Sequence, residues 1–137
     1  MGGVEVKIAA IGDNVIDRYL NKDVMYPGGN AVNVAAHASM LGAQAAYIGE
    51  IGNDLGGRII TDALSSLNVD LSQSSMPEKA TTKTCDVNVY NGERVEVGYD
   101  TGAGRTKPIS PILMSSFFRD SMRFLPASMQ SCRMMCT

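Results

Sequence analysis

Two glycines and two asparagines at the start of a predicted helix have the chemistry to bind hydroxyl groups. They are Gly28, Gly29, Asn30 and Asn33, within the stretch YPGGNAVNVAAHASMLGA that spans Tyr26–Ala43. Glycines let the backbone approach a ligand without an intervening Cβ, and the first turn of a helix offers unpaired N–H donors. Because a carboxamide both donates and accepts, the two asparagines suit hydroxyls, whereas phosphates call for Lys or Arg. The alternative is an ordinary turn with Asn30 as the N-cap of the helix.

A carboxylate is expected beside these amides. Asp17 follows the first predicted strand, near the carboxyl edge at which open parallel sheets bind their ligands. A carboxylate that accepts hydrogen bonds from neighbouring hydroxyls is the usual partner of a sugar. We therefore predict that Asp17, Asn30 and Asn33 converge on a sugar at this edge of the sheet.

Hydrophobic periodicity predicts the elements that must position these residues. Apolar runs alternate with helical stripes, which implies a right-handed parallel βαβ unit and an α/β fold. The segment 12–22, between the first strand and the glycines, reads as polar and rich in turns. The expected elements are a strand buried on both faces at 6–12, a helix that begins at Asn30 and is ended by Gly42 in the left-handed conformation, a buried strand at 43–52, and a second helix capped by Asp54.

Each predicted helix has an apolar face that we expect to pack in a shared core. On the first helix this face consists of Ala31, Val34, Ala35, Ala38 and Leu41. On the second helix it consists of Ile59, Ile60, Ala63, Leu64 and Leu67.

An antiparallel hairpin with one solvated face is predicted at about 82–100. Its alternating apolar residues are Cys85, Val87 and Val89 before Asn91-Gly92, and Val95, Val97 and Tyr99 after it. A two-residue turn would place Val89 opposite Arg94 and mix apolar with polar residues on each face. We therefore predict a three-residue loop at 90–92, with Gly92 in the left-handed conformation. In that register Val87 lies opposite Val95, and Cys85 lies opposite Val97.

Composition and charge narrow the class of protein. The chain has 137 residues, of which 45% are hydrophobic and 19% charged, and its net charge is -2. These values are typical of one globular domain and give no electrostatic reason to expect a nucleic acid or membrane partner. Three cysteines (Cys85, Cys132 and Cys136) and a single histidine support neither a disulfide framework nor a metal site. Without a signal-like segment or a long apolar run, we expect a cytoplasmic protein.

Four segments together resemble the PfkB family of ribokinase-like carbohydrate kinases. They are AAIGDNVIDRY, YPGGNAVNVAAHASMLGA, YIGEIGNDLGGRIITDALSSLNVD and NGERVEV, and the resemblance covers residues 4 to about 107. It implies that 1–107 is the N-terminal, substrate-binding half of a ribokinase-like kinase domain. The hairpin would then be a lid over the sugar and the contact of a homodimer. The first two segments are most similar to fructoselysine 6-kinases, which implies a sugar or sugar-amine substrate.

The resemblance also implies roles for individual residues and cofactors. An Asp after the first strand binds sugar hydroxyls in the family, and the corresponding residue here is Asp17. The glycine pair and the two asparagines of the family motif correspond to Gly28, Gly29, Asn30 and Asn33, and Asp13 is a weaker candidate. The activity implied is transfer of the γ-phosphoryl group of ATP to a sugar hydroxyl, with Mg²⁺.

The ATP-binding half of such kinases has no counterpart among these 137 residues. In the family it contains the nucleotide site, an Asn-x-x-Glu magnesium motif and an Asp-Thr-x-Gly-Ala-Gly-Asp segment whose last Asp is the base. Asp100–Arg105 reads DTGAGR, which lacks both the spacer and the final Asp, so we assign it no function. We therefore expect a truncated kinase without a catalytic residue, inactive alone. The alternative is a noncatalytic fragment that acts by dimerising.

Two further expectations concern the tail and a rival class of enzyme. The stretch 108–137 contains more than half of the nine methionines and has no clear helical or strand pattern. We expect it to come from a shifted reading frame or a variant exon, and the alternative is a Met-rich helix packed on the sheet. A dinucleotide-binding oxidoreductase is disfavoured, because the segment after Gly12 does not continue as G-x-G-x-x-G.

Overall fold

The computed structural model describes residues 5–102. The predictions for 108–137, for Cys132 and Cys136, and for the end of Asp100–Arg105 lie outside the described residues. Residues 5–102 form strands and helices in the order β1, β2, β3, α1, β4, α2, β5, β6. Neither helix in this part of the chain is long and apolar enough to cross a membrane.

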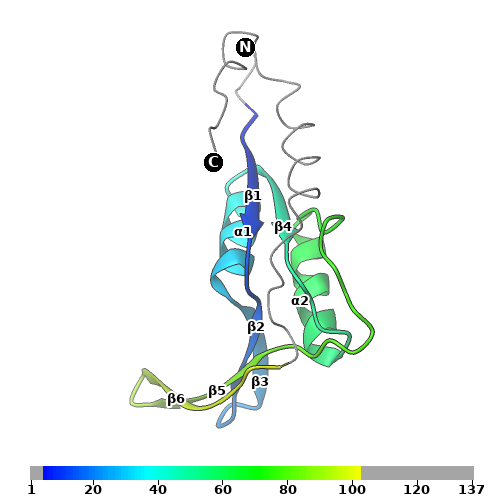
Figure 1. The fold of residues 1–137 in the computed structure, drawn as a ribbon. Helices are drawn as coiled ribbons and strands as arrows, with labels where there is room; N and C mark the ends of the chain where they lie inside the picture. The colour runs from blue at the N-terminus through cyan, green and yellow to red at the C-terminus, as the bar shows by residue number, and fades with distance from the viewer. Residues whose placement is uncertain (1–4, 103–137) are drawn as a thin grey trace, which may run out of the picture. The chain divides into compact units, whose positions relative to one another are not determined.

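Two parallel strands, β1 and β4, form one sheet of the fold. β1 (Lys7–Ile11) and β4 (Gln44–Ile48) run in the same direction, with their first residues opposite each other. The helix α1 (Asn30–Met40) connects them in the sequence through β2 and β3 and packs against both strands, as Figure 1 shows. The predicted parallel β-α-β arrangement is therefore confirmed.

The two strands of this pair differ in burial. The last four residues of β4 are buried, as predicted, whereas only Ala10 is fully buried in β1 and Ile11 is 39% exposed. A strand is buried on both faces only where other elements cover both of them. Within residues 5–102, β4 is the only strand that pairs with β1. The prediction that the first strand is buried on both faces was wrong for the part of the chain that the structure describes.

The first helix begins and packs somewhat differently from the prediction. Its N-cap is Gly29, with φ 103, so Asn30 is the first helical residue and not the cap. Val32 is buried in the place expected for Val34, which is 52% exposed. The buried face is Ala31, Val32, Ala35 and Ala38, and Leu41 lies outside it at 88% exposed. The three predicted alanines are buried, and the face differs from the prediction in containing Val32 in place of Val34 and Leu41.

The C-terminus of α1 is as predicted. Gly42 adopts φ 89, in the left-handed region. Its N–H donates to the carbonyl of Ser39 at 2.9 Å, and the N–H of Ala43 donates to the carbonyl of Ala38 at 3.0 Å. These two bonds are the Schellman arrangement, which satisfies carbonyls that the helix end would leave unpaired.

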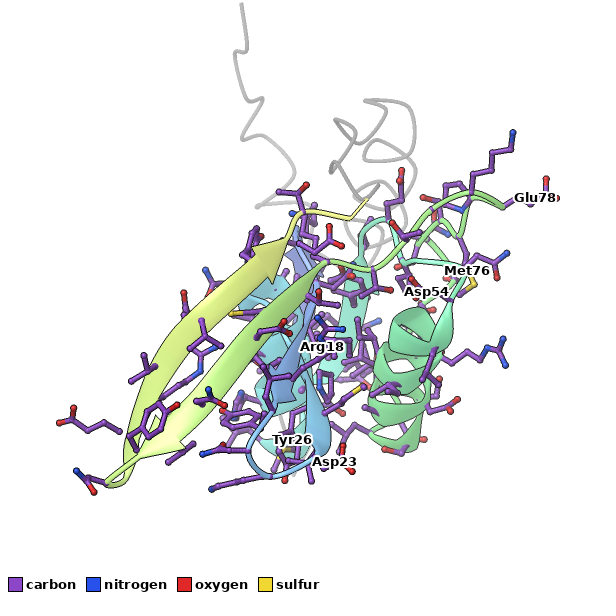
Figure 2. All side chains as sticks on the ribbon, turned by 90° about the horizontal axis from the view of Figure 1, so that it is seen from below. Arg18, Asp23, Tyr26, Asp54, Met76 and Glu78 are labelled. Atoms are coloured by element: carbon purple, nitrogen blue, oxygen red, sulfur yellow. The ribbon has the colours of Figure 1, made fainter. Side chains whose placement is uncertain are left out.

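The second helix, α2 (Leu55–Ser66), is capped by Asp54, which confirms that prediction. One carboxylate oxygen of Asp54 accepts from the N–H of Gly57 at 2.9 Å and from the hydroxyl of Thr82 at 2.6 Å, and the other accepts from the N–H of Thr82 at 2.7 Å. Figure 2 shows Asp54 at the start of α2, with Met76 and Glu78 on the loop beside it. Asp54 therefore joins the start of the helix to the segment that leads into β5.

A second sheet contains four strands, in the order β3-β2-β5-β6. They are β2 (Val15–Tyr19), β3 (Val24–Gly28), β5 (Thr84–Tyr90) and β6 (Glu93–Asp100). The predicted lid hairpin corresponds to β5 and β6, which extend away from the helices in Figure 1. The interpretation of 12–22 as a polar, turn-rich segment missed β2, which occupies the middle of it, although residues 20–22 do form a turn. The charged residues of β2 are accommodated in the sheet by ion pairs, from Arg18 to the neighbouring strand β5 and from Asp17 to β6 beyond it.

The predicted register of the hairpin was also wrong. Asn91 and Gly92 form a two-residue turn with φ 50 and 84, and Val89 lies opposite Arg94. Only the positive φ of Gly92 agrees with the prediction. Near the tip, apolar residues of one strand thus lie opposite polar residues of the other. Farther along the hairpin, after the pair Val87 and Glu96, the register shifts by one residue. A register shift between β5 and β6, at the part of β5 that also pairs with β2, thus replaces the bulge that we expected at the tip.

We predict that the Asp54 cap makes stability depend on pH. Burial alone would raise the pKa of Asp54, but hydrogen bonds from Thr82, Gly57 and Gly56 outweigh it and hold the pKa below its usual value. A lowered folded pKa stabilises the protein above the unfolded pKa, and this contribution is lost as pH falls through the folded value. Asp54→Asn should therefore lower the unfolding free energy at pH 7 by about 1–3 kcal/mol, measured by urea titration.

The difference between wild type and Asp54→Asn should shrink as pH falls below about 4. Asp62→Asn removes an exposed carboxylate from the same helix and is the matched control, with a change within about 0.5 kcal/mol. A difference for Asp54→Asn that is the same at pH 7 and pH 2.5 would contradict the role of the charge.

Candidate functional site

The candidate site lies where β3 enters α1 and where β1 enters β2. Val15 is opposite Gly28, and Asp17 is opposite Tyr26, so Asp17 and Gly28 lie diagonally on one face of the sheet. A Cβ on Gly28 would lie 3.2 Å from Oδ2 of Asp17. The absence of a side chain at Gly28 therefore lets the Asp17 carboxylate pack against the β3 backbone, and two of the predicted residues are brought together.

Gly29 is fixed by both its conformation and its surroundings. Its φ of 103 lies in the region that favours glycine. A Cβ at this position would lie 2.7 Å from the carbonyl oxygen of Asp13 and 2.8 Å from the Cα of Asn14. The turn before α1 consequently packs backbone to backbone against the β1–β2 connection. Asp13, the weaker candidate, is half-buried and contributes its carbonyl to this contact.

Asn30 and Asn33 lie exposed in the first turn of α1. The backbone of Asn33 is used by the helix, since its N–H donates to the carbonyl of Gly29 at 2.9 Å and its carbonyl lies 2.7 Å from Nδ1 of His37. Within residues 5–102, neither carboxamide makes a hydrogen bond, and none joins them to Asp17. Both amides are thus available to a ligand, and their convergence with Asp17 on a sugar stays a prediction.

A buried network that the sequence did not single out holds the β1–β2 connection. Asn14 is 5% exposed, and its Nδ2 donates to the hydroxyl of Tyr47 at 2.8 Å and to the carbonyl of Glu50 at 2.7 Å. The Tyr47 hydroxyl in turn donates to the carbonyl of Gly12 at 2.9 Å. Burial raises the pKa of Tyr47, so its hydroxyl stays protonated and able to donate. β4 thereby fixes the backbone on which Gly29 packs.

A second unanticipated residue, Arg94 on β6, reaches the candidate site. Its Nη2 donates to Oδ1 of Asp17 at 3.2 Å and lies 3.8 Å from the sulfur of Cys85, while its Nη1 donates to Oε1 of Glu96 at 2.8 Å. Hydrogen bonding to Glu96 and the charge of Asp17 raise the pKa of Arg94, so the guanidinium remains charged. The sequence pattern identified Arg94 only as part of the hairpin, because nothing local indicates a contact with β2.

The opposite face of the same sheet contains another ion pair. Arg18 and Asp86 are directly opposite on β2 and β5. Nε of Arg18 lies 2.6 Å from Oδ1 of Asp86, and Nη2 lies 2.9 Å from Oδ2, so both carboxylate oxygens are engaged. Figure 2 shows Arg18 in the middle of the sheet, with Asp23 and Tyr26 at the β2–β3 end. This bidentate pair joins two strands and leaves no oxygen of Asp86 free for a ligand.

A metal-binding cluster is not found in the described part of the chain. Among residues 5–102, no group of three or more His, Cys, Asp or Glu side chains is placed to hold a metal ion. The described residues at the candidate site offer acceptors and donors for hydroxyl groups.

Comparisons with known proteins identify the family of the chain. Residues 5–110 match the model of the pfkB family carbohydrate kinases. A fructosamine kinase of Bacillus subtilis (strain 168) is 53% identical over 49 residues, which are 36% of this chain and 17% of that protein. The fructoselysine 6-kinase of Escherichia coli (strain K12) is 34% identical over 95 residues, which are 69% of this chain and 36% of that protein. The chain spans about a third or less of the length of these relatives.

The fold is also found among solved structures. An uncharacterized sugar kinase from Pyrococcus horikoshii, solved in complex with ATP, has a TM-score of 0.61 and 30% sequence identity. The match covers 70% of this chain and 35% of that protein.

We predict that the Tyr47 hydroxyl is required to hold the β1–β2 connection. Tyr47→Phe removes the acceptor for Asn14 and the donor for Gly12 in a fully buried place, so it should lower the unfolding free energy by about 1–3 kcal/mol. Tyr26→Phe removes an equivalent hydroxyl from a side chain that is 55% exposed, and it should change stability by less than about 0.5 kcal/mol. Equal effects of the two substitutions in urea unfolding would contradict this assignment.

Proposed function

The chain belongs to the pfkB family of carbohydrate kinases and has a ribokinase-like α/β fold, and from this premise we propose that residues 5–102 form the sugar-binding part of such a kinase. The observation that supports the proposal most directly is the position of the Asp17 carboxylate beside a glycine. One oxygen, Oδ2, lies 3.2 Å from the position that a Cβ on Gly28 would take, so the glycine lets the carboxylate pack against the start of the α1 turn while the Asp17 side chain stays 23% exposed to a ligand.

The groups around this oxygen suit a polyhydroxylated ligand. Asp17 accepts hydrogen bonds from hydroxyls, and the carboxamides of Asn30 and Asn33 can accept from and donate to others. The backbone turn at Gly28 and Gly29 has no side chain that would occlude the ligand. Asp13 is assigned to the edge of this site through its backbone. Each hydroxyl that is held on two sides has its orientation fixed, which is what a phosphoryl acceptor requires.

The substrate class that we propose is a sugar-amine adduct of the fructoselysine type. It is supported by the names of the two relatives, a fructosamine kinase and a fructoselysine 6-kinase. The reaction would be transfer of a phosphoryl group from ATP, which is bound in a solved relative, to a hydroxyl of the sugar. ATP would supply the phosphoryl group, and Mg²⁺ would neutralise its charge. We assign neither a metal ligand nor a catalytic base to residues 5–102, among which no cluster of three metal-binding side chains is found.

A second candidate function is self-association through the hairpin. Val95, Val97 and Tyr99 on β6 are 41%, 50% and 62% exposed, and β6 is an edge strand of the sheet. Exposed apolar edges favour pairing with another chain. A noncatalytic fragment that only dimerises would sediment as a dimer and show no affinity for sugars. We propose that the 137-residue chain binds sugar but does not release ADP from ATP by itself.

We predict that Asp17→Asn weakens the binding of fructoselysine to the purified chain about tenfold or more, measured by isothermal titration calorimetry. The reason is that a hydrogen bond to a charged group contributes about 1.5–3 kcal/mol, and about 1.4 kcal/mol corresponds to a factor of ten. Asp23→Asn is the matched control, because it neutralises an exposed carboxylate in the β2–β3 turn, where φ is 52 and asparagine is tolerated. The proposal is wrong if Asp17→Asn and Asp23→Asn bind fructoselysine equally well. Fructose and ribose, titrated in parallel, should bind more weakly than fructoselysine.

A further inference from the structure

We propose that Arg94 on β6 is a positioning residue for the Asp17 carboxylate, so that sugar affinity depends on the β5–β6 hairpin. The inference rests on the proposed function, because it assigns a role to Arg94 through the carboxylate of the sugar site. This role is narrower than that of a lid, since the Arg94 side chain acts on one atom, Oδ1 of Asp17.

The contact spans a strand. Asp17 on β2 is directly opposite Cys85 on β5, and Arg94 comes from β6, on the far side of β5. To reach Oδ1 of Asp17 at 3.2 Å, the guanidinium passes the sulfur of Cys85 at 3.8 Å. An ion pair between β6 and β2 therefore crosses the whole of β5. Movement of the hairpin relative to β2 must change the surroundings of the Asp17 carboxylate.

The guanidinium is held from both ends. Nη1 donates to Glu96 at 2.8 Å, which lies two residues along the same strand and hence on the same face. This leaves Nη2 directed at Asp17. Because the guanidinium is planar and rigid, fixing one nitrogen also fixes the direction of the other.

The two oxygens of Asp17 have different neighbours. Oδ1 accepts from Arg94, whereas Oδ2 is the atom that lies against Gly28. Within the described residues, Oδ2 makes no hydrogen bond. A monodentate contact of this kind fixes the rotation of the carboxylate and keeps one oxygen available to a hydroxyl. Arg94 thereby orients the acceptor without occupying it.

The second arginine of the sheet provides a direct comparison. The Arg18–Asp86 pair has side chains that are 40% and 23% exposed, and the Arg94–Asp17 pair has side chains that are 41% and 23% exposed. Burial therefore does not distinguish the two pairs. The Arg18 pair is bidentate and joins neighbouring strands, which is a purely structural arrangement, whereas the Arg94 pair engages one oxygen only. Arg18→Gln is consequently a matched control for Arg94→Gln.

The test measures fructoselysine affinity by calorimetry for the wild-type chain and for single and double variants. Arg94→Gln should bind fructoselysine about three- to fivefold more weakly than wild type, as expected for losing a partly exposed ion pair. Arg94→Lys should restore part of this loss, because an ammonium keeps the charge but cannot hold Glu96 and Asp17 in a fixed fork. In the Asp17→Asn background, Arg94→Gln should cause no further loss. Arg18→Gln should leave the affinity unchanged.

The outcomes separate this inference from the proposed function. If Arg94→Gln binds fructoselysine as tightly as wild type does, the positioning role is wrong while the sugar site stands. The same follows if Arg94→Gln lowers the affinity equally in the wild-type and Asp17→Asn backgrounds. If Asp17→Asn binds fructoselysine as tightly as wild type, or wild type does not bind it, the proposed function fails first. If urea unfolding shows that Arg94→Gln does not fold, the test uses Arg94→Lys instead. Fructoselysine binding by Arg94→Lys that equals wild type overturns the inference. Weaker binding that is seen with Asp17 but not in the Asp17→Asn background supports it.

Discussion

The described fold depends on one close contact between two backbone segments. Gly29 lies so near Asp13 and Asn14 that a Cβ would overlap the carbonyl oxygen of one and the Cα of the other. At this contact the chain passes from β1 to β2 and, farther along the sequence, from β3 into α1. The two sheets are therefore joined where neither chain segment carries an intervening side chain. On the other side of the β1–β2 connection, Asn14 is anchored to Tyr47 and Glu50.

Ion pairs differ between the two faces of the four-stranded sheet. Asp17 and Arg18 are adjacent in β2, so their side chains lie on opposite faces. On one face, Asp86 uses both oxygens to bind Arg18 and strengthens the pairing of β2 with β5. On the other, Asp17 shares one oxygen with Arg94 and keeps the second beside Gly28. The same pairing chemistry thus gives a structural link on one face and a candidate sugar site on the other.

The sequence predicted those features that are determined locally. The end of α1 at Gly42 and the cap of α2 at Asp54 follow from the side chain or conformational freedom of a single residue. The strand β2 was missed because its charged residues are stabilised only by partners far along the chain. The hairpin register was missed because the register shifts where β5 also pairs with β2, whereas the pattern of the hairpin alone favoured a bulge at its tip. The contribution of Arg94 could not be predicted for the same reason, since it depends on a contact across β5.

The most direct test of the account is the location of bound sugar on the chain. Amide chemical shifts of the isotopically labelled 137-residue protein would be followed by NMR as fructoselysine is added to saturation. The sugar site described above predicts that the largest changes fall on the amides of Gly28, Gly29 and Asn30, with Asp17 and Asn33 also affected. Saturable binding that leaves the amides of Gly28, Gly29 and Asn30 unchanged would contradict it.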